Sequence, residues 1–166
     1  SGGILCAASL VLSRALEREG FKPTLAVGCS GGSLYAGVIA LNMDSDTALA
    51  LTTELYKNDI VEGYASNLRA AMSGETRFTE TSGLVDDRLM LERLQSAFGG
   101  KTFEDTVIPL HVVATDFYSG EAVVLSSGNL VEAVHASSAI PMVFPPVRIG
   151  DKLLVDGAVS NPLPID

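Results

Sequence analysis

A serine in a glycine-rich turn is the first candidate for chemistry. Ser30 stands in a G-x-S-x-G pattern, after the apolar run Thr24–Val27 and before a second apolar run, Ser33–Leu41. A strand that leads through this pattern directly into a helix is typical of a nucleophile elbow, in which a sharp turn exposes the serine hydroxyl at the edge of a sheet. Larger side chains beside the serine would collide with the packed strand and helix, so three positions are expected to require glycine: Gly28, Gly31 and Gly32. The pattern predicts a nucleophilic serine, and a plain glycine-rich turn is the alternative.

A nucleophilic serine needs a base that accepts its proton. Asp156 follows the apolar run Leu153–Val155, so its carboxylate is expected at the end of a strand, as Ser30 is. A carboxylate can serve as the base if its surroundings keep it ionised, and a simple Asp-Gly turn is the alternative. Of the two histidines, His111 lies inside an apolar strand-like run and is expected in the core. His135 lies in a helix of small residues and could complete a Ser-His-Asp esterase of small soluble esters.

The anion that forms when a serine attacks an ester needs N–H donors. Gly2 and Gly3 stand directly before the helix-like run Ile4–Glu19, and the start of a helix presents unpaired N–H groups toward negative charge. These two glycines are therefore predicted to form an oxyanion hole, and a flexible terminus is the alternative. A metal site is not predicted, because neither histidine has a partner at ligand spacing and Cys6 and Cys29 lie far apart in the sequence.

The elements that must position these residues alternate between helices and strands. Helices are expected at Ile4–Glu19, from Asp44 to about Asn58, from Asp86 and Asp87 to Phe98, and at Asn129–Ser138. Strands are expected at Leu110–Thr115, Glu121–Leu125, Val147–Ile149 and Lys152–Val155, the last two as a hairpin. The polar stretch Gly63–Gly83 gives few signals and is interpreted as helix and loop that could cover the site. This order predicts an α/β domain with a mostly parallel sheet covered on both faces.

Composition and charge narrow the class of protein. The chain has 166 residues, of which 47% are hydrophobic and 19% charged, which fits one folded domain and excludes a disordered chain. Its formal net charge is -9, and it has no cluster of Lys or Arg that would bind nucleic acid or anchor it to a membrane. It has no apolar run of membrane-spanning length and no signal-like start. A soluble, cytoplasmic protein without nucleic-acid partners is therefore expected.

Five segments together resemble, in order, the motifs of the patatin-like phospholipase family. Ser1–Cys6 is similar to the family's oxyanion loop, G-G-G-x-R/K-G, and Gly28–Gly32 to its G-x-S-x-G motif. The others are Thr115–Glu121, which resembles its T-D-x-x-x-G-E stretch, Ala136–Pro146, which resembles the bacterial segment ahead of the last motif, and Asp156–Ala158, which resembles its D-G-G/A box. The resemblance spans nearly the whole chain.

This resemblance implies a three-layer α/β/α fold and a serine acyl hydrolase without cofactor. Ser30 would attack a fatty acyl ester of a phospholipid, a lysophospholipid or a related lipid, and Asp156 would take and return the proton. The amides of Gly2 and Gly3 would hold the oxyanion. The family's preceding strand and following elements are missing, so the chain is expected to be a single-domain segment of 1–166 that is incomplete at both ends.

Two points of the resemblance carry further expectations. Three positions of the oxyanion loop, Ser1, Leu5 and Cys6, depart from the family's pattern, so a catalytically inactive domain that binds acyl groups or lipids is an alternative. A lipid substrate also implies transient contact with a membrane surface. An exposed apolar rim would provide it, either from Met142–Phe144 or from Gly63–Gly83, and either segment could equally belong to the core.

Overall fold

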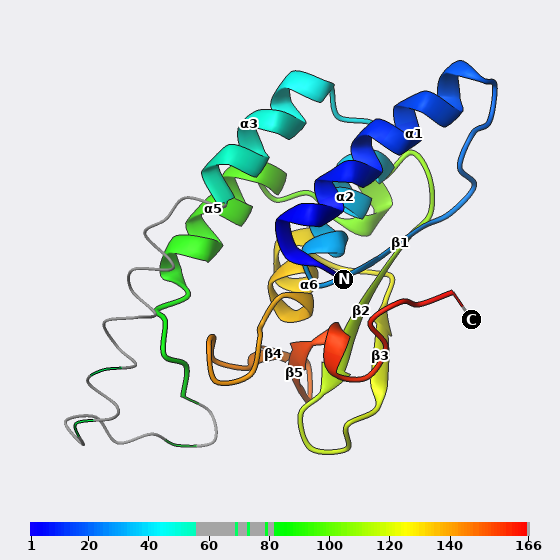
Figure 1. Cartoon of the computed structure of the whole chain (residues 1–166). Coiled ribbons are helices and arrows are strands. Elements are labelled where there is room, and N and C mark those ends of the chain that lie inside the picture. Colours follow the sequence, from blue (N-terminus) through cyan, green and yellow to red (C-terminus); the bar gives the residue numbers. More distant parts are fainter. Residues whose placement is uncertain (56–68, 70–72, 74–78, 80–81, 166) are drawn as a thin grey trace.

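The computed structural model describes residues 1–55, 69, 73, 79 and 82–165, and it alternates helices with short strands (Figure 1). The helices are a 3-10 helix at Gly3–Ala7, α1 at Ala8–Arg18, α2 at Gly31–Ala40, α3 at Ser45–Leu55, α5 at Arg88–Phe98 and α6 at Leu130–Ser137. Two short 3-10 helices lie at Phe103–Asp105 and Gly157–Val159. The strands are β1 at Ala26–Cys29, β2 at Leu110–Asp116, β3 at Ala122–Leu125, β4 at Val147–Ile149 and β5 at Lys152–Asp156. The expected elements and the α/β class are confirmed, apart from the last part of the helix expected to reach about Asn58 and most of Gly63–Gly83, which lie outside the described residues.

The sheet is mixed in direction where mostly parallel strands were expected. In the described part of the chain β1 pairs with β2 in parallel, whereas the pairs β2–β3, β2–β5 and β4–β5 are antiparallel. Short connections explain two of these three antiparallel pairs. A parallel pair needs a crossover of a dozen residues or more, but only Gly150 and Asp151 separate β4 from β5, and a five-residue turn separates β2 from β3. These pairs can only be hairpins.

Two strands meet end to end on one edge of β2. β1 pairs with residues 110–113 of β2, and β5 pairs with residues 114–116. Because β3 pairs with residues 112–115 and overlaps both of these stretches, it must lie along the other edge of β2. β1 runs parallel to β2 and β5 antiparallel to it, so their carboxyl ends face each other. Cys29 is opposite Val113 and Asp156 is opposite Ala114, which brings the residues that follow β1 next to the end of β5.

Capping residues at several helices account for where the helices begin and end. The α1 helix ends in a Schellman motif, in which Phe21 N–H donates to the Leu16 carbonyl and Gly20 N–H to that of Glu17. The side chain of Asp44 accepts from the amide of Thr47 at the start of α3, and that of Asn129 accepts from the amide of Val131 at the start of α6. These local signals agree with the boundaries expected from the sequence.

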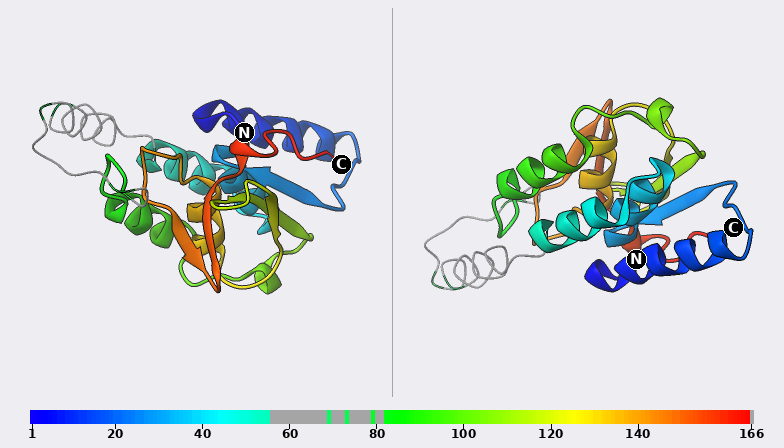
Figure 2. Two further views of the ribbon diagram at one scale, coloured as in Figure 1. Left: turned by 90° about the horizontal axis from the view of Figure 1, so that it is seen from below. Right: turned by 90° about the horizontal axis from the view of Figure 1, so that it is seen from above.

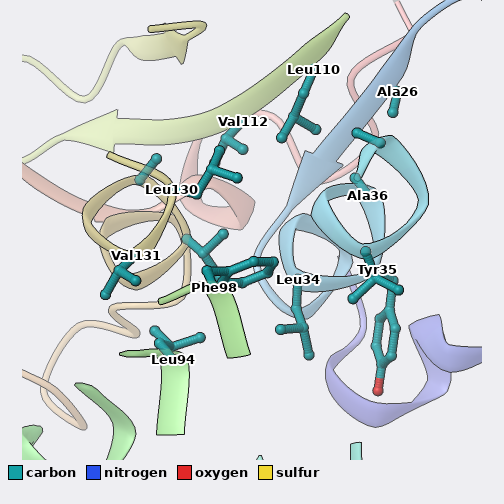
Figure 3. Close-up of a cluster of buried hydrophobic side chains, with 14 of the residues drawn as sticks. Ala26, Leu34, Tyr35, Ala36, Leu94, Phe98, Leu110, Val112, Leu130 and Val131 are labelled. Carbon is teal, nitrogen blue, oxygen red and sulfur yellow. The ribbon is translucent and has the colours of Figure 1, made fainter. Parts of the chain in front are cut away.

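The main core lies between α2, α5, α6 and the strands β1 and β2. Phe98 of α5 occupies the middle of this cluster, with Leu34 of α2 on one side and Leu130 of α6 on the other (Figure 3). The ring of Phe98 packs so closely on α2 that a Cβ at Gly37 would come within 3.1 Å of it. Phe98 and Leu130 are 1% and 0% exposed, so this cluster holds α2 and α6 in fixed positions relative to the sheet.

The α1 helix is attached more loosely than the others. It has no buried residue, and it leaves apolar side chains such as Val11 and Leu12 exposed. Figure 2 shows α1 and the residues after β5 on one side of β1, with α5 and α6 on the other.

Across the described residues, none of the helices combines the length and the apolar character that a membrane crossing requires.

Candidate active site

Ser30 lies at a sharp turn between β1 and α2. The strand ends at Cys29 and the helix begins at Gly31, so a single residue makes the connection. Ser30 adopts φ 55° and ψ -135°, a left-handed conformation that non-glycine residues rarely adopt and that costs on the order of 1–3 kcal/mol. Ser33 fixes the turn, because its N–H and its hydroxyl both donate to the Ser30 carbonyl, at 2.8 Å and 2.6 Å. Backbone strain of this kind persists only where neighbouring contacts enforce it.

Close packing requires glycine at two of the three positions named for the turn. A Cβ at Gly28 would collide with the backbone of Ser33 and lie 2.8 Å from the Cβ of Ala36. A Cβ at Gly31 would come within 2.6 Å of the Cα of Gly3. Gly32 differs, since a Cβ there would make an ordinary contact of 3.7 Å with the sulfur of Cys6. The expected steric need for glycine therefore holds at Gly28 and Gly31 and does not hold at Gly32.

The structure brings Asp156 and Ser30 into direct contact. Asp156 is the last residue of β5 and is 3% exposed. Its Oδ2 accepts a hydrogen bond of 2.6 Å from Ser30 Oγ, and its Oδ1 accepts one of 2.8 Å from the N–H of Ala158. The hydroxyl of Thr115 also donates to the backbone carbonyl of Asp156, at 2.9 Å. The two residues are 126 positions apart in the sequence and meet because β1 and β5 end at the same place on β2.

The surroundings of Asp156 oppose its ionisation. Burial raises the pKa of this carboxyl above the ordinary value of an aspartate, because the charged form loses its hydration. The hydrogen bonds from Ser30 and Ala158 act in the opposite direction, since they stabilise the carboxylate. The result is a carboxylate that accepts a proton more readily than an exposed aspartate, beside a hydroxyl that can supply one.

The buried thiol next to Ser30 is not a competing nucleophile. Burial raises the pKa of Cys29 to about 11, so its thiol stays protonated at neutral pH. Its sulfur packs against the turn after β5, where a Cβ at Gly157 would come within 3.0 Å of it. A Cβ at Gly157 would also collide with the carbonyl of Val113, so glycine is required directly after Asp156.

The loop that contains Gly2 and Gly3 lies against the turn at Ser30. Gly2 and Gly3 have φ values of 146° and 55°. The backbone of Gly3 lies so close to Gly31 that a Cβ at Gly31 would collide with it. No hydrogen bond between described residues uses the N–H of Gly2, Gly3 or Gly31. These amides are therefore available to a ligand at the start of α2, where the helix dipole favours negative charge.

Two of the three departures from the family's loop pattern are accommodated without strain. Cys6 is not among the described residues with positive φ, so its side chain causes no backbone strain where the family has glycine. Its sulfur packs near Gly2 and Gly32. Leu5 is 80% exposed, so it leaves an apolar side chain on the surface where the family has a basic one.

The structure does not bring either histidine to Ser30. His135 is buried in α6, and its Nε2 lies 3.2 Å from a carboxylate oxygen of Asp87. Burial lowers the pKa of His135, and the nearby Asp87 acts against this shift. His111 lies in β2, as expected, and is only half-buried. The hydroxyl of Ser30 donates to Asp156 instead.

The sequence pattern alone did not assign a role to the end of α6. The hydroxyl of Ser137 accepts a hydrogen bond of 2.9 Å from the N–H of Ser30, and the carbonyl of Ala139 accepts one of 2.9 Å from the N–H of Asp156. Both residues lie in the segment Ala136–Pro146, which carried part of the family resemblance. The family resemblance marked this segment as similar, but it did not predict which residues the segment contacts.

Comparisons with known proteins agree with this arrangement of the fold. The sequence model of the patatin-like phospholipase family matches residues 1–166. The chain is 33% identical over 138 residues to an uncharacterized NTE family protein of Mycobacterium tuberculosis, covering 82% of this chain and 21% of that protein. It is 28% identical over 165 residues to an uncharacterized NTE family protein of Mycobacterium bovis, covering 99% of this chain and 42% of that protein. The chain therefore belongs to the patatin-like phospholipase family.

A solved structure supports the fold independently. The crystal structure of VipD from Legionella pneumophila matches with a TM-score of 0.61 at 16% sequence identity, covering 96% of this chain and 45% of that chain. The chain thus spans less than half the length of each of these three proteins. Membership of the family supports lipid acyl hydrolysis at the level of the family.

Proposed function

We propose that the chain carries the catalytic centre of a serine acyl hydrolase that cleaves fatty acyl esters of phospholipids, lysophospholipids or related lipids. Ser30 is the nucleophile and Asp156 is the base. The observation that carries this proposal is the hydrogen bond of 2.6 Å from Ser30 Oγ to a buried carboxylate. Family membership supports the class of substrate.

In the first half of the reaction the acyl group moves to the protein. Asp156 takes the proton of Ser30 while Ser30 Oγ forms a bond to the ester carbonyl carbon. The carbonyl oxygen becomes an oxyanion, and the amides of Gly2 and Gly3, with the N-terminal end of α2, stabilise it. The bond to the leaving alcohol then breaks, and Asp156 gives its proton to that alcohol.

In the second half water releases the acyl group. Asp156 takes a proton from a water molecule, which attacks the acyl-serine carbonyl through the same oxyanion site. The bond to Ser30 Oγ breaks, Ser30 recovers its proton from Asp156, and a free fatty acid leaves. The raised pKa of Asp156 favours this role, because a base works best when its pKa approaches the operating pH.

The proposed lipid substrate also fits the surface around the dyad. Two exposed apolar side chains lie near the site in the sequence: Leu5, two positions after Gly3, is 80% exposed, and Val159, three positions after Asp156, is 58% exposed. Met142 is 74% exposed, whereas Phe144 is buried, so of the Met142–Phe144 segment only part can form an apolar rim. We therefore include transient contact with a membrane surface in the proposal.

The test uses the full-length protein and three substrates: a diacyl phospholipid, a lysophospholipid and a short p-nitrophenyl ester. Ser30→Ala and Asp156→Asn are each expected to abolish turnover of every substrate that the wild type cleaves. Matched controls are Ser127→Ala and Asp151→Asn, which change exposed residues of the same types and should leave turnover intact.

Two outcomes would contradict the proposal. Turnover that survives Ser30→Ala would show that another residue carries the reaction. Lipid binding by the wild type without any release of fatty acid would favour the inactive lipid-binding domain.

A further inference from the structure

A fully buried hydroxyl connects α6 to the strained turn at Ser30. Ser137 is 0% exposed, and its Oγ accepts the hydrogen bond of 2.9 Å from the N–H of Ser30. The same hydroxyl donates to the carbonyl of Val113 in β2, at 2.6 Å. Ser137 therefore links the turn, the central strand and the end of α6 through one side chain.

The hydrogen-bonding capacity of this hydroxyl indicates what it can do. A serine has one O–H donor, and Val113 takes it, while a lone pair of Ser137 Oγ accepts from Ser30. Ser137 has no proton left to give to a substrate. Its contact with Ser30 is to the backbone N–H and leaves Ser30 Oγ free to bond to Asp156.

The segment that holds Ser30 also holds Asp156. Two residues after Ser137, the carbonyl of Ala139 accepts the N–H of Asp156, at 2.9 Å. The backbone of each member of the dyad is thus bound to the same short segment. Of the two contacts, the one from Ser137 is made by a side chain, so a substitution can remove it.

We propose that Ser137 is a positioning residue that holds the backbone of Ser30 in its left-handed conformation and so sets the distance from Ser30 Oγ to Asp156. This inference rests on the proposed function of the same site. A buried N–H that loses its partner is unfavourable, so without Ser137 Oγ the turn at Ser30 relaxes away from its strained geometry. A displacement of about 1 Å at a reacting atom lowers rates by roughly 100-fold.

The experiment compares Ser137→Ala with Ser138→Ala in the full-length protein. Ser138 is the neighbouring serine, is half-buried, and its hydroxyl makes no hydrogen bond to any described residue. The readouts are the rate at which a fluorophosphonate probe labels Ser30, kcat and KM for a short ester, and hydrogen exchange of the Ser30 amide. Ser137→Cys is the second variant, because it keeps nearly the same volume but offers only a weak donor and acceptor.

We expect Ser137→Ala to label about 10- to 100-fold more slowly, with a fall in kcat, an unchanged KM and faster exchange of the Ser30 amide. Ser137→Cys should follow in the same direction, and Ser138→Ala should match the wild type. If Ser137→Ala does not fold, the labelling rate and amide exchange of Ser137→Cys test the inference. Wild-type labelling rates in the Ser137 variants would overturn the inference and leave the proposed function intact.

A wild type that the probe does not label would instead contradict the proposed function. In that case the rate of hydrogen exchange at the Ser30 amide is the measurement that tests the inference. Faster exchange in Ser137→Ala supports the positioning role, and unchanged exchange overturns it.

Discussion

Two adjacent glycines in the first turn of α2 provide the sharpest test of the proposed oxyanion site. In Gly31→Ala the new Cβ would lie 2.6 Å from the Cα of Gly3, whereas an ordinary contact is at least 3.4 Å. The difference requires the loop with Gly2 and Gly3 to move by about 0.8 Å. The clash involves the backbone of the loop, so no side-chain rotation can relieve it. A displacement of this size at catalytic donors is expected to lower kcat/KM by roughly 100-fold.

Gly32→Ala is the matched control for this substitution. Its Cβ would meet the sulfur of Cys6 at 3.7 Å, which is ordinary contact. Both glycines lie in the same turn of the same helix, so the gain in helix propensity on changing Gly to Ala, up to about 1 kcal/mol, is similar for both. Gly32→Ala should therefore keep wild-type activity and be as stable as the wild type or more so.

The assay measures kcat/KM for a short p-nitrophenyl ester and the thermal unfolding midpoint of the full-length protein and both variants. A large loss of activity in Gly31→Ala alone, in a protein that still folds, is the expected result. Full activity in Gly31→Ala would refute the role of the glycine loop. An equal loss in Gly32→Ala would show that any alanine in this turn is harmful and that the loop contact is not the cause.

Asp156, His135 and Met142 each provide a further test of the site and its surroundings. Because burial raises the pKa of Asp156, kcat/KM should fall as pH drops through a value above the usual aspartate range of about 3.9. Above its raised pKa, the buried carboxyl of Asp156 is ionised, and its lost hydration lowers the free energy of unfolding; below the pKa that it has in the unfolded chain, this cost is absent. Asp156→Asn should therefore raise the melting temperature at neutral pH. Thermal melts at a series of pH values should show this gain vanish near about pH 4. His135→Gln, which places a polar amide where the imidazole approaches Asp87, should retain near wild-type kcat, whereas a histidine base would predict a loss of about 10⁴-fold. Met142→Gln should weaken sedimentation with phosphatidylcholine vesicles without changing hydrolysis of a soluble ester, and Val124→Gln, at another exposed apolar residue, should leave both unchanged.

Local signals in the sequence were sufficient to predict the elements and to name Ser30 and Asp156 as candidates, whereas their pairing as a dyad came from the family resemblance. Ser30 was predicted from the apolar run before it, the glycines around it and the helical run after it, all of which lie within about twenty residues. Asp156 was predicted from the strand that precedes it. Hydrogen bonds between residues close together in the sequence and the periodicity of apolar residues determine these features, and both can be predicted from a short stretch of sequence.

The direction of the strands and the contacts between distant segments could not be read in this way. Alternation of helices and strands favoured a parallel sheet, but the hairpins at β2–β3 and β4–β5 give a mixed one. Whether β5 shares an edge of β2 with β1 depends on pairing of β2 with residues 84 positions earlier in β1 and 38 to 42 positions later in β5, for which no local pattern exists. Ser137 was not given a role for the same reason, since its partners Ser30 and Val113 lie in other elements.

The most direct test of the dyad measures how fast a fluorophosphonate probe modifies the full-length protein, with the modified residue located by peptide mass spectrometry. We predict a single adduct on Ser30, formed roughly 100-fold or more slowly in Asp156→Asn because the serine then lacks its base. An adduct on another residue, or equal rates in the two proteins, would contradict the assignment of Ser30 and Asp156 as nucleophile and base.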